Sequence, residues 1–131
     1  MKSFTSSDCD TLFAQAESSE VMRAHKLLHD SHDDKVQRLL IAFVKGSYVA
    51  PHYHELPHQW EMFVVMRGEL LIKTYSYLDE VKVVSETIAR EGDILEVQPR
   101  EAHSVECISN RALLLEIKEG PFQDKYAKVM L

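Results

Sequence analysis

Short β-rich runs fill most of the chain from residue 36 onward. Each run is apolar or alternates apolar and polar positions, and turn residues separate the runs at intervals of about 8–12 residues. The predicted strands are 36–44, 48–54, 60–67, 70–77, 81–88, 94–97, 104–108 and 112–118. Such spacing is typical of antiparallel sandwiches and barrels, and not of alternating strands and helices. The pattern therefore predicts an all-β barrel over residues 36–118.

The first 35 residues have a helical pattern instead. Ser6-Ser7-Asp8 can cap a helix of about three turns, and residues 20–28 predict a second short helix before a polar loop. After the last strand, Gly120-Pro121 leads into a C-terminal tail. The chain contains no internal repeat and no long linker. We therefore expect one domain over 1–131, with a helical N-terminal arm (1–35), a β-barrel (36–118) and a tail (119–131).

Composition narrows the possible partners. The formal net charge is −6, from 15 basic and 21 acidic side chains, which disfavours nucleic acid and anionic membrane surfaces. No apolar run has the length of a membrane span, and the N-terminus lacks the apolar region of a secretory signal. Cys9 and Cys107 are expected to be reduced thiols. These features predict a soluble, cytoplasmic protein with a small-molecule ligand.

Three histidines and one glutamate are candidate metal ligands. His52 and His54 are two residues apart on a predicted strand, so they project to the same side, and Tyr48 is expected on that face as well. If strands 48–54 and 60–67 pair through the loop 55–59, Glu61 meets both imidazoles. His103 follows at another predicted strand. Three imidazoles and a carboxylate suit iron, manganese, nickel, copper or zinc.

Further polar side chains are candidates for substrate contact. His58 lies in the loop beside the candidate ligands, and Arg38 alternates with Leu40 and Ala42, which would point it into the barrel mouth. There Arg38 would bind a substrate carboxylate or phosphate, or pair with Glu116; the sequence leaves both open. The complete set is Arg38, Tyr48, His58, Lys73, Tyr75 and Glu116.

Two other histidines, His25 and His29, have i, i+4 spacing on the second predicted helix. This spacing is compatible with a metal site. No third ligand lies near them in the sequence, so we expect surface histidines.

The spacing of glycines and ligands resembles the two sequence motifs of the cupin superfamily. Gly46-x5-His52-x-His54-x6-Glu61-x6-Gly68 resembles the first motif, and Gly92, Pro99 and His103 resemble the second. The long gap between His54 and Glu61 is similar to that of the WbuC family of cupins. Scattered further matches to that family are Arg23, His29, Val36-Gln37-Arg38, Glu116-x-Lys118-Glu119-Gly120-Pro121-Phe122 and Asp124-Lys125-Tyr126-Ala127. One departure is Arg100, where the second motif has glycine, and it predicts an altered turn before His103.

The resemblance implies a cupin double-stranded β-helix (jelly-roll barrel) with a short N-terminal helical arm. It implies one divalent transition metal (Fe, Mn, Ni or Zn) held by His52, His54, Glu61 and His103, and an association with bacterial surface-polysaccharide (O-antigen) metabolism. Open positions on such a metal lead us to expect a metal-dependent enzyme, an oxygenase, isomerase or lyase, acting on a small polar or sugar-derived substrate. Two alternatives remain open: a non-catalytic metal- or sugar-binding module, and a metal-independent sugar-nucleotide isomerase or epimerase. Cupins often pair through sheet edges, so a homodimer is expected.

Overall fold

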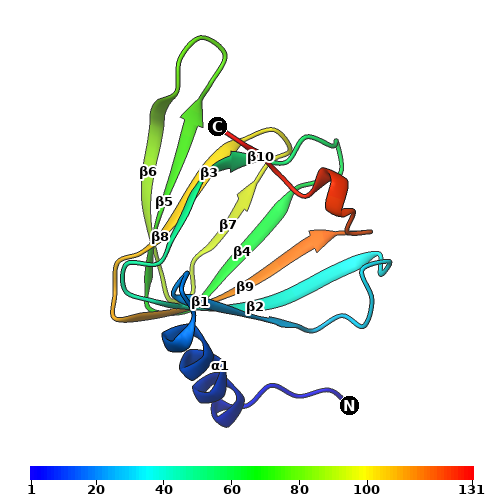
Figure 1. Ribbon diagram of the computed structural model, residues 1–131, viewed down its shortest axis with the longest axis vertical. Helices are drawn as coiled ribbons and strands as arrows, with labels where there is room; N and C mark the ends of the chain where they lie inside the picture. The colour runs from blue at the N-terminus through cyan, green and yellow to red at the C-terminus, as the bar shows by residue number, and fades with distance from the viewer.

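The structure, a computed structural model, describes residues 1–131 and contains two five-stranded antiparallel sheets (Figure 1). In spatial order, the first sheet consists of β1 (Arg23–Leu27), β2 (Val36–Val44), β9 (Arg111–Glu119), β4 (Glu61–Arg67) and β7 (Ile94–Val97). The second consists of β10 (Val129–Met130), β3 (Tyr48–Tyr53), β8 (Ala102–Cys107), β5 (Glu69–Ser76) and β6 (Lys82–Arg90). All strands predicted between residues 36 and 118 are present with small shifts at their ends, so the all-β prediction is confirmed.

The two sheets pack face to face around one apolar core. Phe43 and Leu114 from the first sheet belong to the same buried cluster as Leu70 and Val105 from the second. Because successive strand residues point to opposite faces, every second residue of these strands contributes to the core. At one end of the barrel, inward positions are occupied by histidine and glutamate instead, and this end holds the candidate site.

The predicted N-terminal helix is α1 (Ser6–Ser18). It begins at a capping box, in which the Thr5 side chain accepts from the Asp8 backbone N–H and the Asp8 side chain accepts from the Thr5 backbone N–H. Phe13 and its apolar neighbours pack against Leu40, Ala42 and Leu113 on the outer face of β2 and β9. Strand β2 is therefore covered on both faces, which explains its nearly continuous apolar run. The chain has no helix long and apolar enough to cross a membrane.

The second predicted helix, over residues 20–28, was wrong, because this segment forms strand β1. β1 pairs antiparallel with β2 over a register that runs from Arg23 opposite Phe43 to Leu27 opposite Leu39. Its polar side chains fit an edge strand, and pairing with β2 overrides the local helical preference. His25 and His29 therefore do not share a helix face. His29 is buried beyond the strand, with its Nδ1 3.0 Å from the backbone nitrogen of Arg38.

Strands β3 and β4 do not pair, contrary to the expectation that the loop 55–59 makes a hairpin. β3 belongs to the second sheet and β4 to the first. The loop crosses from one sheet to the other, and His52 and Glu61 approach each other across the barrel interior. The two parts of the first motif, on β3 and β4, are thus brought together by sheet packing and not by strand pairing.

The C-terminal tail returns to the barrel and lies over the end that holds the candidate site (Figure 1). A short 3₁₀ helix, η1 (Asp124–Tyr126), precedes β10, which pairs antiparallel with β3 through Val129 opposite Tyr53 and Met130 opposite His52. The tail adds the edge strand of the second sheet.

Replacing Phe13 with alanine is expected to destabilise the fold by about 3–5 kcal/mol, the usual cost of truncating a buried aromatic side chain. Phe13 is only 2% exposed, so the deletion leaves a cavity between α1 and the first sheet. Chemical denaturation measures the loss. Leu78→Ala is the control because Leu78 is 95% exposed, and it should change the free energy of unfolding by less than about 0.5 kcal/mol. Equal effects of the two substitutions would contradict the packing of α1.

Candidate metal centre

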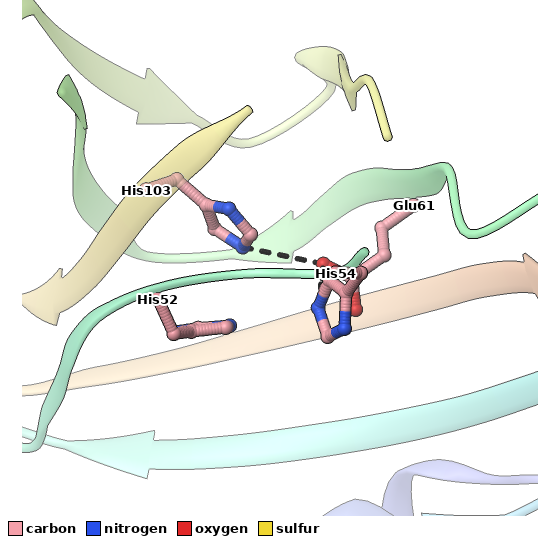
Figure 2. Close-up of side chains that lie close together, drawn as sticks. All are labelled: His52, His54, Glu61 and His103. Carbon is pink, nitrogen blue, oxygen red and sulfur yellow. Dashed lines mark ion pairs between the residues drawn. The ribbon is translucent and has the colours of Figure 1, made fainter. Parts of the chain in front are cut away.

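Four candidate ligands come together from three strands and one loop (Figure 2). His52 lies on β3 opposite His103 of β8, and Glu61 is the first residue of β4. His54 follows the end of β3 directly. The ligand atoms of the four side chains all lie within 4.8 Å of one another. The structure therefore brings together the four residues that the sequence singles out.

A β-bulge decides which side chains of β3 face this centre. Val49 pairs with Val105 and His52 with His103, so β3 has one residue more than β8 between the two pairs. The extra residue breaks the alternation, and both Val49 and His52 face the barrel interior. Tyr48 consequently lies on the outer face and is 50% exposed. The expectation that Tyr48 shares the face of the histidines was wrong for this reason.

The Glu61 carboxylate is the anionic centre of the group. Its Oε2 lies 3.1 Å from Nε2 of His54 and 3.2 Å from Nε2 of His103. The carboxylate is removed from solvent, since Glu61 is 5% and His103 only 1% exposed. The His54 side chain is the more exposed of the two imidazoles near Glu61, at 11%. A buried carboxylate requires compensating charge or hydrogen bonds, and the surrounding imidazoles are the groups that can supply them.

All three histidines present Nε2 to the centre because Nδ1 of each is held by a backbone carbonyl. The Nδ1 atoms lie 2.8 Å from the Ala50 oxygen for His52, 2.6 Å from the Ala127 oxygen for His54, and 3.0 Å from the Glu101 oxygen for His103. A carbonyl only accepts, so each Nδ1 carries the proton and each neutral ring has a free lone pair on Nε2. This outer hydrogen bond is the usual partner of a metal-ligating histidine.

Two buried atoms at the centre have no hydrogen-bond partner, namely Nε2 of His54 and Oε2 of Glu61. They are close to each other, but the arrangement does not satisfy hydrogen-bond geometry. Unpaired buried polar atoms are costly, and several that converge on one point are satisfied together by a cation among them. The donor set thus fits a divalent transition metal.

The protonation states agree with ligation. Burial lowers the pKa of His52 to about 4, so its ring is neutral at pH 7. Burial opposes ionisation of Glu61, but the close His103 and His54 rings hold the pKa of its carboxyl well below the usual range. Burial alone would lower the pKa of His103, and contact with Glu61 raises it. The group therefore contains an ionised carboxylate and at least one imidazole that stays neutral over most of the pH range.

A cavity of about 280 Å³ adjoins the four ligands and opens toward β1 and the tail. Its deeper wall is apolar and includes Ile41, Phe63 and Leu114. Glu116 is a buried acid in this wall and lies 3.6 Å from Nζ of Lys118. Burial and the charge of Glu61 raise the pKa of Glu116 to about 8. Of the six candidates for substrate contact, Glu116 is the one that lines this cavity.

The structure places the other five candidates away from the cavity. Arg38 is exposed and shares its face of β2 with Leu40 and Ala42, which pack against α1, so its expected position in the barrel mouth was wrong. Lys73 and Tyr75 alternate with inward residues of β5 and lie on the outer face with Tyr48. There Lys73 pairs with Glu86 at 2.8 Å, and the Tyr75 hydroxyl lies 2.8 Å from Oγ of Ser104. His58 stays in the turn between β3 and β4, outside the ligand group.

Three cations at the cavity mouth, Arg23, Lys118 and Lys128, were not among the predicted substrate contacts, and neither was the neighbouring His25. The alternation of Arg23, His25 and Leu27 would have placed Arg23 and His25 on one face if residues 23–27 had been read as a strand. No local pattern marks Lys128, which reaches the cavity because the tail folds back over the barrel.

Arg100 adopts a backbone conformation that normally favours glycine. Its φ is +66°, in the left-handed region, and His103 still lies within the ligand group, so Arg100 does not direct it away. Three contacts hold this conformation: the Arg100 N–H donates to the His54 carbonyl at 2.8 Å, its Nε donates to the Glu55 carbonyl at 3.2 Å, and the Tyr77 hydroxyl donates to the Arg100 carbonyl at 2.6 Å. These contacts offset the strain of the backbone and join the loop after β3 to the loop before β8.

Solved structures similar to this chain include cupins. KdgF from Halomonas sp. matches with a TM-score of 0.62 and 14% identity, over 79% of this chain and 82% of its own. An RmlC-like cupin from Shewanella frigidimarina matches with a TM-score of 0.61 and 18% identity, over 79% and 80%. An oxalate oxidase solved with the substrate analogue glycolate has a TM-score of 0.67 and 21% identity, over 87% of this chain and 57% of its own. At these identities the likeness establishes the fold.

Comparison of the sequence finds fewer similar proteins than comparison of the structure. No curated protein matches this chain. The model of one family, described as "Domain of unknown function (DUF6016)", matches residues 4–88, which include His52, His54 and Glu61 but not His103. The chain therefore belongs to this family, DUF6016, and has the jelly-roll fold of the cupin superfamily.

Proposed function

We propose that this protein binds one divalent transition metal through His52, His54, Glu61 and His103, and acts as an enzyme on a small polar or sugar-derived substrate in the adjoining cavity. The observation that carries the proposal is the orientation of the three imidazoles. Each is held at Nδ1 by a carbonyl and presents Nε2 to the buried carboxylate. Three nitrogens and one carboxylate oxygen suit iron, manganese, nickel or zinc.

The arrangement is less suited to a metal-independent isomerase or epimerase. Such an enzyme needs one general base and one acid facing a substrate. Here the imidazoles face one another and Glu61, and the distances between their ring centroids are 4.4–5.9 Å. When bound, the metal supplies Lewis-acid chemistry at the floor of the cavity. The chain's own contribution is to position the ligands, to exclude water with the apolar wall, and to offer Glu116 and Lys118 for polar contacts with a substrate.

The small-molecule assignment has two further supports. A cavity of about 280 Å³ suits only a small ligand, since it is just below the range of about 300–1,000 Å³ that is usual for small-molecule sites. One of the similar structures, the oxalate oxidase, holds a small organic acid, glycolate. The resemblance to the WbuC family supports a role in surface-polysaccharide metabolism. The homodimer and the cytoplasmic location expected from the sequence stay predictions.

Protein purified without added metal is expected to contain close to one transition-metal ion per chain. His52→Ala and His54→Ala should each lose most of it, because a three-ligand site binds more weakly and leaves the Glu61 carboxylate less compensated. Elemental analysis by mass spectrometry measures the content. His58→Ala is the matched control, since it removes the same side chain from the neighbouring turn and should keep its metal. Unchanged metal in both His52→Ala and His54→Ala would refute the site.

Whether the metal serves catalysis is tested on a panel of sugars and sugar acids. The reconstituted protein is expected to convert at least one member, and His54→Ala to convert none. If neither the reconstituted protein nor His54→Ala converts any compound, but the protein binds a compound only when metal is present, the non-catalytic binding module is favoured.

The tail is expected to support metal binding through its contact with His54. Ending the chain at Phe122 removes the Ala127 carbonyl that accepts from His54, and also the Tyr126 carbonyl that accepts from Nε2 of Gln59 at 2.7 Å. Loss of such an outer hydrogen bond weakens metal binding by about tenfold or more. A competition titration with a chelator measures the change. Met130→Ala is the control, because it keeps the tail backbone and should bind metal normally. A shortened chain that folds and retains full metal affinity would show that the tail does not position His54.

A further inference from the structure

The mouth of the cavity is positively charged, although the chain as a whole has a net charge of −6. Arg23 comes from the edge strand β1, Lys118 from the end of β9, and Lys128 from the tail. His25 of β1 lies beside them, but burial and these cations lower its pKa, so its ring adds no charge at pH 7. These segments are far apart in the sequence and meet only at this opening. Their convergence gives the mouth a local charge of the sign that attracts anions.

Strand geometry directs the two side chains of β1 to the interior. Arg23 pairs with Phe43 and His25 with Ile41, and both partners belong to the inward core of β2. Side chains of paired residues lie on the same face of a sheet, so Arg23 and His25 face the cavity. Lys26, which pairs with Leu40, lies on the opposite face.

Arg23 is partly buried and has no counter-charge. It is the one arginine of this chain that is not exposed. No carboxylate lies within 4.0 Å of it, and its guanidinium makes only two long contacts of 3.4 Å, to the Val21 and Tyr48 carbonyls. Burial lowers its pKa. A guanidinium has five donors in a planar fork, so most of its hydrogen-bonding capacity remains unused here.

Lys118 and Lys128 differ in whether an acidic side chain lies close to them. Lys118 has one, since Nζ is 3.6 Å from the Glu116 carboxyl group. Lys128 forms no ion pair, although it lines the same cavity. The free positive charges are therefore at the outer end of the cavity, whereas the candidate ligands and Glu116 lie deeper.

We propose that Arg23 and Lys128 bind the anionic group of a small organic oxyanion, a carboxylate or a phosphate ester, whose remainder extends into the cavity. This inference rests on the proposed function in one respect, namely that the inner end of the bound oxyanion reaches the metal centre. Arg23 and Lys128 belong to the chain itself, so they bind the anionic group with or without metal. An oxyanion accepts two parallel bonds from the guanidinium fork, and the low polarity of the cavity wall strengthens them. A neutral sugar would leave both cations unpaired.

Binding of simple probes tests this directly. Glutarate and malonate are compared with their neutral diamides, and glycerol 3-phosphate with glycerol, by calorimetry at constant ionic strength. At least one anion is expected to bind about tenfold or more tightly than its neutral match. The two anion classes show whether a carboxylate or a phosphate is preferred. Equal binding of anions and neutral matches, including no binding by either, would overturn the proposal.

Substitutions locate the effect. Arg23→Gln and Lys128→Gln should each weaken anion binding by about tenfold. Lys26→Gln is the matched control for the first, on the same strand but the opposite face, and Lys125→Gln for the second, in the same tail but outside the cavity. Both controls remove one positive charge and should leave binding unchanged. Lys128→Gln changes an exposed side chain and tests the proposal if Arg23→Gln fails to fold. Equal losses in variants and controls would show a nonspecific charge effect and overturn the proposal.

Metal content separates this inference from the proposed function. Arg23→Gln and Lys128→Gln should keep the metal content of the unchanged protein while losing anion binding. Absence of metal with selective anion binding at Arg23 and Lys128 would overturn the metal centre alone. Normal metal content with no selective anion binding would overturn the anion site alone.

Discussion

A carboxylate buried inside an apolar barrel is the constraint on which the arrangement of this end of the molecule depends. Glu61 is 5% exposed and ionised, and taking such a charge out of water is costly unless other groups compensate it. The nearest groups are imidazoles from two different segments, since Nε2 of His54 and of His103 both lie within 3.2 Å of the carboxylate. Because β4 lies in one sheet and β3 and β8 in the other, this cluster also joins the two sheets. A bound cation would complete the compensation.

Backbone geometry, more than side-chain packing, holds the imidazoles in place. The bulge in β3 turns His52 inward beside His103, and the left-handed backbone at Arg100 allows an N–H to reach the His54 carbonyl. One backbone carbonyl then orients each ring. For His52 and His103 this carbonyl lies two residues earlier in the chain, and for His54 it belongs to the tail. The tail thus has two roles, since it orients His54 and brings Lys128 to the mouth of the same cavity.

The sequence predicts the fold well, because strand alternation and turn residues are local signals. Spacing and the resemblance to the cupin motifs also single out His52, His54, Glu61 and His103, which the structure brings together. The positions of the expected substrate contacts could not be predicted, because they depend on non-local pairing. A one-residue bulge places Tyr48 on the outer face, and α1 packs against the face of β2 that carries Arg38. Arg23 was missed because its segment has helical propensity, and only pairing with β2 makes it a strand.

The central claim is that the four side chains share one metal ion. X-ray diffraction from crystals of the purified protein, recorded on both sides of the absorption edge of the metal that is present, tests it most directly. The account predicts a single anomalous peak about 2.0–2.3 Å from Nε2 of His52, His54 and His103 and from a carboxylate oxygen of Glu61. A peak elsewhere on the molecule, or no peak with the three Nε2 atoms bonded to water, would contradict it.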